Sequence, residues 1–335
     1  MPRHALQGKA QYHGTSMSSP NACGVAACVL SAARAAGIAA CGPAALKRAL
    51  VNTARPAGIA DPFAQGAGLL DAAACAAYVA AHAGKPGQDL QFDVSLPARD
   101  GARGLYLRDE AELDGPSSFG VLVRPRFSHA NRRTGDEMDE LLALELDLRL
   151  EASADWVTCP ESMRLLSAKE RGGQSFAIRL NATGLSPGVH FASVRGVDAA
   201  DPARGSLFSL PVTVVVPHSR VVSAEARTYT DEVTGDEFTL KENGVDYTTT
   251  YRLVQGVPNR RFITVPRGAE WATIKVKGGP YADPSASPRV YLHGVPFVRG
   301  DMHNVMSQMK RVCQVKHGVE ETYQMKVKGG STLEL

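Results

Sequence analysis

Ser16 is the residue whose setting in this chain most suggests chemistry. It lies in the stretch QYHGTSMSSPNACG (11–24), between Gly-Thr and Met-Ser-Ser-Pro, and a run of small apolar residues follows with no charge before Arg34. Such a run predicts a buried helix, and Pro20 suits a first helical turn. Unpaired backbone N–H groups and the positive end of the helix dipole would stabilise a developing oxyanion there. Serine is also a common helix cap, so the residues alone leave two interpretations of Ser16, nucleophile and cap.

A family resemblance favours the nucleophile. The block GTSMSSP with its small-residue helix resembles the nucleophile block of the subtilisin-type serine peptidases, and the extension NACG is similar to the tripeptidyl peptidase II branch. The resemblance implies that Ser16 is catalytic. His13 in HGT is similar to the start of the family's His-Gly-Thr-His motif, but Ser16 stands where that motif needs its second histidine. We therefore interpret His13 as a neighbour of the nucleophile and not as its general base.

Two further segments fit the end of a subtilisin-like domain. PAALKRALVNTARP (43–56) has apolar residues at helical spacing and a predicted basic outer face at Lys47 and Arg48. FAQGAGLLDAAACAAYV (63–79) predicts a glycine-rich turn, a helix cap at Asp71 and another small-residue helix. Residues 1–85 are thus expected to form the helical C-terminal remnant of an α/β subtilisin-like domain, with little for these helices to pack against.

The activating groups of the serine are not found in the sequence. A serine becomes a good nucleophile when a base takes its proton, and the base is oriented by a carboxylate. The family order is Asp, His, Ser, yet only fifteen residues precede Ser16 and none is Asp or Glu. The remaining candidate bases lie outside the motif: His82, His190, His218, His293 and His317. We expect the chain by itself to be inactive, as a piece of a longer peptidase or as a truncated relative.

From residue 89 the pattern changes to short alternating runs that predict strands. Seven such runs precede residue 217: LQFDVSLP, GLYLRD, SFGVLVRPRF, LLALELDLRLEA, SFAIRLNAT, VHFASVRGVD and SLFSLPVTVVV. In LALELDLRL the leucines alternate with Glu145, Asp147 and Arg149, which predicts one core face and one solvated face. Residues 89–217 are therefore expected to form an immunoglobulin-like β-sandwich.

A second all-β unit is expected over 220–335. EARTYTDEVTGDEFTL predicts a hairpin turning at 234–236, and RRFITVPRGAEWATIKVKGG is similar to a phrase in the family's galactose-binding-like jelly roll. The last stretch, ETYQMKVKGGSTLEL, still has strand character where the sequence stops, so this unit is expected to be incomplete. The predicted fold class is multidomain, a helical remnant followed by two all-β sandwiches.

Composition limits the partners. The net charge of +3, without a basic face carrying interleaved aromatics, argues against a nucleic-acid partner. No apolar run reaches the roughly 18 residues of a membrane span, and the N-terminus has no signal-peptide core. The six cysteines lack Cys-x-x-Cys spacing, and four of them, Cys23, Cys28, Cys41 and Cys75, are predicted to be reduced core thiols of a cytoplasmic protein. Neither a cofactor nor a metal is expected.

The resemblance implies a serine exopeptidase that releases tripeptides from the free N-termini of cytosolic oligopeptides through an acyl-enzyme on Ser16, within a homo-oligomeric parent. The alternative is a non-catalytic β-sandwich interaction protein that carries a relic of the peptidase domain. Sugar binding ranks below both. Its candidate platform residues are Trp271, Tyr281 and Tyr291, and Trp271 is predicted to face the core.

Overall fold

The computed structural model describes residues 14–38, 41–58, 62–85, 87–88, 90–127, 135, 139, 143–166, 173–218, 227–230, 237–241, 244–248, 259–279, 287–297 and 307–335. The chain divides into two compact units. The first comprises Met1–Leu105, Ser118–Arg179 and Ala192–Pro211, and the second comprises Tyr106–Ser117, Leu180–Phe191 and Val212–Leu335.

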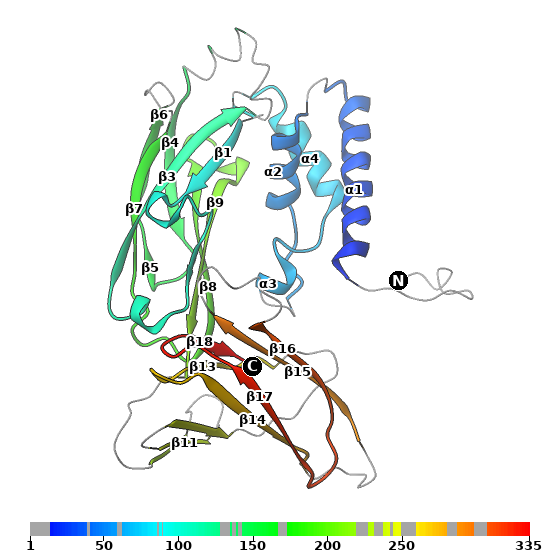
Figure 1. Ribbon diagram of the computed structural model, residues 1–335. Coiled ribbons are helices and arrows are strands. Elements are labelled where there is room, and N and C mark those ends of the chain that lie inside the picture. Colours follow the sequence, from blue (N-terminus) through cyan, green and yellow to red (C-terminus); the bar gives the residue numbers. More distant parts are fainter. Residues whose placement is uncertain are drawn as a thin grey trace, which may run out of the picture. The chain divides into compact units, whose positions relative to one another are not determined.

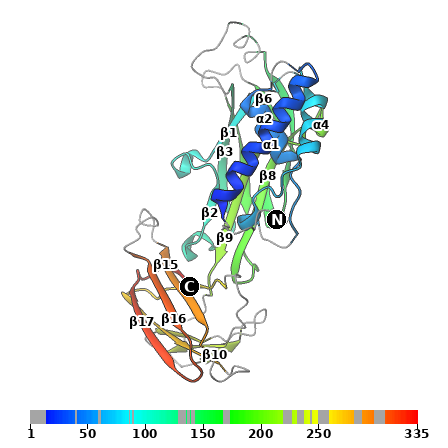
Figure 2. The ribbon, with the colours of Figure 1, turned by 90° about the vertical axis from the view of Figure 1, so that its right-hand side faces the viewer.

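Four α-helices open the first unit: α1 (Thr15–Ala35), α2 (Pro43–Asn52), α3 (Pro62–Gln65) and α4 (Ala72–His82). Figure 1 and Figure 2 show α1, α2 and α4 side by side, with α2 next to the sandwich strands and α1 outermost. The three helices share one apolar core, formed by Val29, Ala33, Ala49, Cys75, Tyr78 and Val79. The helices thus pack on one another and on the neighbouring sandwich, more than the sequence predicts.

Local signals start two of these helices. Asp71 is the N-cap of α4, and its carboxylate accepts a hydrogen bond from the Ala74 backbone N–H at 3.0 Å, which confirms the predicted cap. The helix that follows is alanine-rich and therefore intrinsically favourable. Pro43 occupies the first turn of α2, where its missing N–H costs nothing.

Helix α1 is largely exposed, contrary to the prediction of a buried helix. Val29 and Ala33 are its buried residues. Cys23 and Cys28 are exposed, so the prediction that these two thiols lie in a core is wrong. The physical reason is that α1 is covered on one side only, where it contacts α4 and shares an apolar core with α4 and with Ala49 of α2.

The first sandwich is built from two sheets. One has the strand order β1 (Leu90–Ser95), β3 (Ser117–Phe127), β7 (Gln174–Leu180) and β5 (Val157–Thr158). The other has the order β2 (Leu105–Leu107), β9 (Ser206–Val216), β8 (Gly188–Asp198), β4 (Glu145–Ala152) and β6 (Ser162–Leu166). Short 3₁₀ turns lie between strands: η2 (Pro97–Arg99), η3 (Glu110–Glu112) and η4 (Pro202–Arg204).

The strand pattern of this sandwich follows the sequence closely. All seven predicted runs form strands, and in β4 Leu148 and Leu150 are buried while Glu145, Asp147 and Arg149 are exposed. β5 and β6 are additional strands that the prediction missed. In β6 the signal is present, because Met163 and Leu165 alternate with polar residues and are buried.

The second unit carries the remaining strands. β10 (Arg227–Thr230), β11 (Glu237–Lys241) and β12 (Gly244–Thr248) form one sheet, in which β10 and β11 pair antiparallel as the predicted hairpin requires. The predicted turn at 234–236 lies outside the described residues. A second sheet has the order β13 (Phe262–Thr264), β18 (Thr332–Glu334), β15 (Arg289–Phe297) and β16 (Met309–Gln314), and β14 (Trp271–Lys277) pairs with β17 (Glu320–Lys326).

Trp271 corrects one prediction. Its side chain is 59% exposed, so it does not face the core. In β14 the inward residues are Ala272, Ile274 and Val276, and the period of two places Trp271 on the opposite face. Tyr291 on β15 is also exposed, and Tyr281 lies outside the described residues.

The helices of the described segments are all too short or too polar to cross a membrane.

Candidate active site

Ser16 lies in the first turn of α1 and is exposed. The N-cap position belongs to Gly14, whose φ of 145° favours glycine, and the helix start has no side-chain cap hydrogen bond. The backbone N–H groups of Met17 and Ser18 donate to the Gly14 carbonyl at 3.0 and 3.3 Å. The capping interpretation of Ser16 therefore finds no support in the described geometry, and its hydroxyl stands beside the N–H groups that open a helix.

Pro20 bears directly on this turn. It lies inside α1 and not in the first turn as predicted. A residue at this position would donate its backbone N–H to the carbonyl four residues earlier, which is that of Ser16, but proline has no N–H. The Ser16 carbonyl thus lacks its usual helical partner. The first turn of α1 is consequently held by fewer hydrogen bonds than an ordinary helical turn.

No histidine is hydrogen-bonded to the Ser16 hydroxyl in the described part of the chain. His82 faces a carboxylate, and the rings of His190, His293 and His317 lie within hydrogen-bonding distance of backbone or amide oxygens in their own surroundings. His13 lies outside the described residues. The described segments also contain no group of His, Cys, Asp and Glu arranged to hold a metal ion. What the structure supplies is an exposed serine in the first turn of a helix.

The helix that carries Ser16 is connected to the first sandwich through what we term the helix–sandwich joint. The joint consists of the β8–β9 connection (198–206) and the side chains of α2 and α4 that contact it. Tyr78 on α4 donates its hydroxyl to the Arg204 carbonyl at 2.6 Å. Asn52 on α2 donates its amide to the same carbonyl at 2.8 Å and to the Ser206 carbonyl at 3.1 Å. Two helices thus bind one backbone turn of the sandwich.

Arg48 adds a second anchor and corrects the predicted basic outer face. It is only 7% exposed, and its guanidinium donates to the carbonyls of Gln88 and Leu90. The same group lies 5.9 Å from the centroid of the Phe92 ring, a cation–π distance. The face of α2 predicted to be solvated is therefore turned to the sandwich at this residue, because the Gln88 and Leu90 carbonyls at the start of β1 accept its hydrogen bonds.

A buried ion pair lies within the joint. The Arg204 guanidinium contacts the Asp198 carboxylate at 3.2 Å and donates to the Gly87 carbonyl at 3.3 Å. Both charged side chains are nearly inaccessible, so their charges are compensated by each other and by backbone dipoles and not by water. The pair fixes the conformation of the turn whose carbonyl Tyr78 and Asn52 contact.

Titratable groups surround the C-terminal end of α4. His82 is buried, and its Nδ1 lies 3.7 Å from the Asp201 carboxylate. Burial is the main cause that lowers the pKa of His82, and the positive charge of Lys85 adds to it, against the opposing effect of Asp201. Lys85 contacts the same carboxylate at 2.5 Å, and this hydrogen bond lowers the pKa of Asp201. His82 is therefore favoured in its neutral form.

Sequence reasoning missed Arg48, Asn52, Tyr78 and Arg204. For Arg48 and Asn52 a signal existed, since their positions share the helical face of the buried Ala45 and Ala49. The turn residue Arg204 carried no signal, because its burial depends on helices more than a hundred positions away in sequence.

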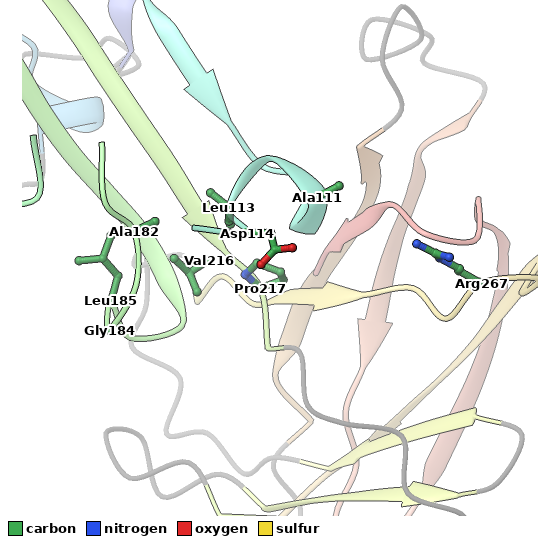
Figure 3. Close-up of a pocket in the computed structure, with 9 residues that line it drawn as sticks. All are labelled: Ala111, Leu113, Asp114, Ala182, Gly184, Leu185, Val216, Pro217 and Arg267. Carbon is green, nitrogen blue, oxygen red and sulfur yellow. The ribbon is translucent and has the colours of Figure 1, made fainter. Parts of the chain in front are cut away.

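One hollow among the described residues has no part in this chemistry. It encloses about 690 Å³ in the second unit, and Figure 3 shows Asp114 and Arg267 among otherwise uncharged residues along its walls. Its lining contains no serine, cysteine or histidine. The hollow therefore offers neither a nucleophile nor a base.

Comparisons with known proteins cover most of the chain. Three family models match: "Tripeptidyl-peptidase II, first Ig-like domain" over residues 90–215, "TPPII, galactose-binding domain-like" over 255–335, and "Subtilase family" over 2–68. These matches confirm a multidomain chain with immunoglobulin-like and galactose-binding-like parts. The subtilase match includes Ser16.

Similar whole proteins are much longer. Tripeptidyl-peptidase 2 of Drosophila melanogaster is 30% identical over all of this chain, which spans 22% of that protein, and the Caenorhabditis elegans protein of the same name is 27% identical with the same coverage. A crystal structure of tripeptidyl peptidase 2 (TPP II) superposes with a TM-score of 0.78 and 28% identity, covering 96% of this chain and 25% of that one. The chain therefore spans about a fifth to a quarter of these relatives.

Proposed function

The chain belongs to the tripeptidyl-peptidase II family of subtilisin-like serine peptidases, and from this we propose that Ser16 is the nucleophile of a peptidase of which these residues form a part. The observation that carries the proposal is the exposed Ser16 in the first turn of α1, behind a glycine N-cap. A serine that only capped the helix would occupy the N-cap position itself.

The chemistry follows from this position. As Ser16 Oγ attacks the peptide carbonyl, its proton passes to a histidine base contributed from outside the described residues, and the carbonyl electrons move onto oxygen. The N–H groups at the start of α1 and the helix dipole stabilise that oxyanion. The base then protonates the leaving amine, and water releases the acyl group from Ser16. These steps require neither a metal nor a cofactor.

The substrate and setting form part of the same proposal. The substrates are oligopeptides with free N-termini, from which tripeptides are released, and the location is cytoplasmic. The names of the relatives support the tripeptidyl specificity. The described cysteines are all free thiols, which fits a reducing compartment. The whole enzyme is proposed to be a homo-oligomer, which the present chain is not expected to form in ordered shape, because closed assembly needs every complementary patch.

A second candidate is a non-catalytic interaction protein that retains a relic of the peptidase domain. It is favoured by the absence of a base for Ser16 among the described residues. The reading frame upstream of Met1 separates the two candidates. Blocks with Asp-Ser/Thr-Gly and His-Gly-Thr-His support the enzyme, whereas a nearby stop codon supports the relic.

An activity-based probe tests the nucleophile directly. A fluorophosphonate should not label the 335-residue chain, because the residues that the structure describes offer Ser16 no hydrogen-bonded base. It should label a longer parent that contains the complete catalytic domain, and Ser16→Ala in that parent should abolish labelling.

Ser19→Ala is the matched control, since Ser19 is also exposed in the same helix. The control should label like the unaltered parent. Labelling that survives Ser16→Ala but is lost in Ser19→Ala would refute the assignment, and labelling of the isolated chain at Ser16 would show that a base is present after all.

A further inference from the structure

We propose that Tyr78 acts as a latch that fixes the Ser16-bearing helix α1 to the first sandwich, so that the sandwich controls the order of the nucleophile helix. The proposal concerns the helix–sandwich joint, and it rests on the proposed function only where it refers to Ser16 as the nucleophile. All the contacts that carry it lie within the first compact unit.

Tyr78 contacts both partners with different parts of its side chain. The ring belongs to the apolar core that also contains Val29 and Ala33, the two buried residues of α1. The hydroxyl donates to the Arg204 carbonyl of the sandwich at 2.6 Å. Burial raises the pKa of the Tyr78 phenol, so the hydroxyl stays protonated and remains a donor. One side chain therefore connects the core of α1 to the β8–β9 connection.

Helix α1 depends on this route because its other support is slight. Most of its residues are exposed, and its main contacts in the described part of the chain are with α4, while Ala49 of α2 completes the shared core. Its first turn has also lost the hydrogen bond that Pro20 cannot donate. An opening of α4 away from the sandwich would therefore be transmitted to α1 with little to oppose it.

The sandwich side of the latch is shaped to receive the helices. Gly205, next to the acceptor residue, has a φ of +66°, and a Cβ at this position would lie 2.8 Å from the Asn52 amide nitrogen. Glycine thus provides both the left-handed backbone and the room for Asn52. Asn52 donates to the same carbonyl as Tyr78. The two donors share one acceptor, so their effects should not be independent.

Hydrogen–deuterium exchange on the 335-residue chain tests the latch. Tyr78→Phe removes the hydroxyl and keeps the ring. The amides of residues 25–35 in α1 should then exchange roughly three- to tenfold faster, the factor expected for one lost hydrogen bond in a local opening. Amides of β4 and β7 should keep their exchange rates, because their cores do not involve the hydroxyl. Tyr291→Phe is the matched control, since Tyr291 is 80% exposed on β15, and it should leave α1 unchanged.

Asn52→Ala and the double variant measure the coupling. Each single change should speed exchange in α1, and the double variant should differ from the product of the single effects because the carbonyl is shared. The latch is overturned if Tyr78→Phe raises the amide exchange rates of α1 by less than about 1.5-fold over those of the unaltered chain. It is also overturned if the exchange rates of β4 and β7 rise as much as those of α1. The latter result would indicate general loss of stability.

A probe measurement adds a readout that a purely structural role would not change. In a parent that reacts with a fluorophosphonate, Tyr78→Phe should lower the acylation rate constant and leave the dissociation constant of the probe unaltered. Exchange in α1 does not depend on the reactivity of Ser16. If the probe never reacts, the proposed function fails while the exchange result still decides the latch.

Discussion

The buried pair Arg204–Asp198 offers the sharpest test of the joint. The change is Arg204→Met, which keeps an unbranched apolar stem and removes the guanidinium. Arg204 is 4% exposed and Asp198 6%, and their charged atoms lie 3.2 Å apart. Without Arg204 the Asp198 carboxylate stays buried with its charge uncompensated.

The expected loss is large for a single residue. Removing one partner of a buried ion pair costs about 3–5 kcal/mol of the free energy of unfolding. The lost donation to the Gly87 carbonyl at 3.3 Å acts in the same direction. Replacing both charges leaves no buried charge behind, so Arg204→Met combined with Asp198→Asn should recover most of the loss. Asparagine keeps an oxygen that can accept from the Ala200 N–H, as Asp198 does at 3.0 Å.

Urea unfolding of the 335-residue chain in a Trp271→Phe background, followed by fluorescence of Trp156 in the first unit, measures these free energies. Arg195→Met is the control on the same sheet, because Arg195 is exposed and its 3.4 Å ion pair with Glu151 should contribute at most about 1 kcal/mol. The reasoning is refuted if Arg204→Met costs no more than the control, or if the double variant is as unstable as the single one.

Three further outcomes follow from the described contacts. Burial, and after it the charge of Lys85, lowers the pKa of His82, so on acidification the unfolded chain binds a proton before the folded chain does. The free energy of unfolding should therefore fall as the pH drops below the ordinary histidine pKa of about 6.5. In urea titrations at several pH values, His82→Gln should flatten that dependence. Gly196→Ala would place a Cβ 2.3 Å from the Phe208 ring and should cost about 1–3 kcal/mol in thermal unfolding, whereas the same change at the open Gly120 should cost much less. Asp71→Ala should reduce stability by about 1 kcal/mol, and Asp71→Asn should retain most of the cap, as circular dichroism melts of the two variants would show; equal losses would count against the capping role.

Local pattern predicted much of this protein correctly. The period of two in β4 and in the other six predicted strands needs only neighbouring residues, and the Asp71 cap and the β10–β11 hairpin are likewise encoded within a few positions. The block around Ser16 that resembles the subtilisin nucleophile block could be recognised for the same reason, because a glycine, a serine and a small-residue helix lie together in sequence. The role of Ser16 itself remains a proposal.

Tertiary structure decided which face of each helix or strand packs against another element. A helical pattern predicts that Arg48 shares a face with Ala45. Only the packing of α2 on β1 brings backbone carbonyls within reach of the Arg48 guanidinium and so makes its burial favourable. Trp271 and the thiols of α1 are apolar by composition, yet they are exposed because no described element covers them. Arg204 is buried because two helices distant in sequence meet its turn. Whether a side chain is buried depends on contacts between segments that are distant in sequence. Residue type alone sets only how much free energy is gained or lost if that side chain is buried.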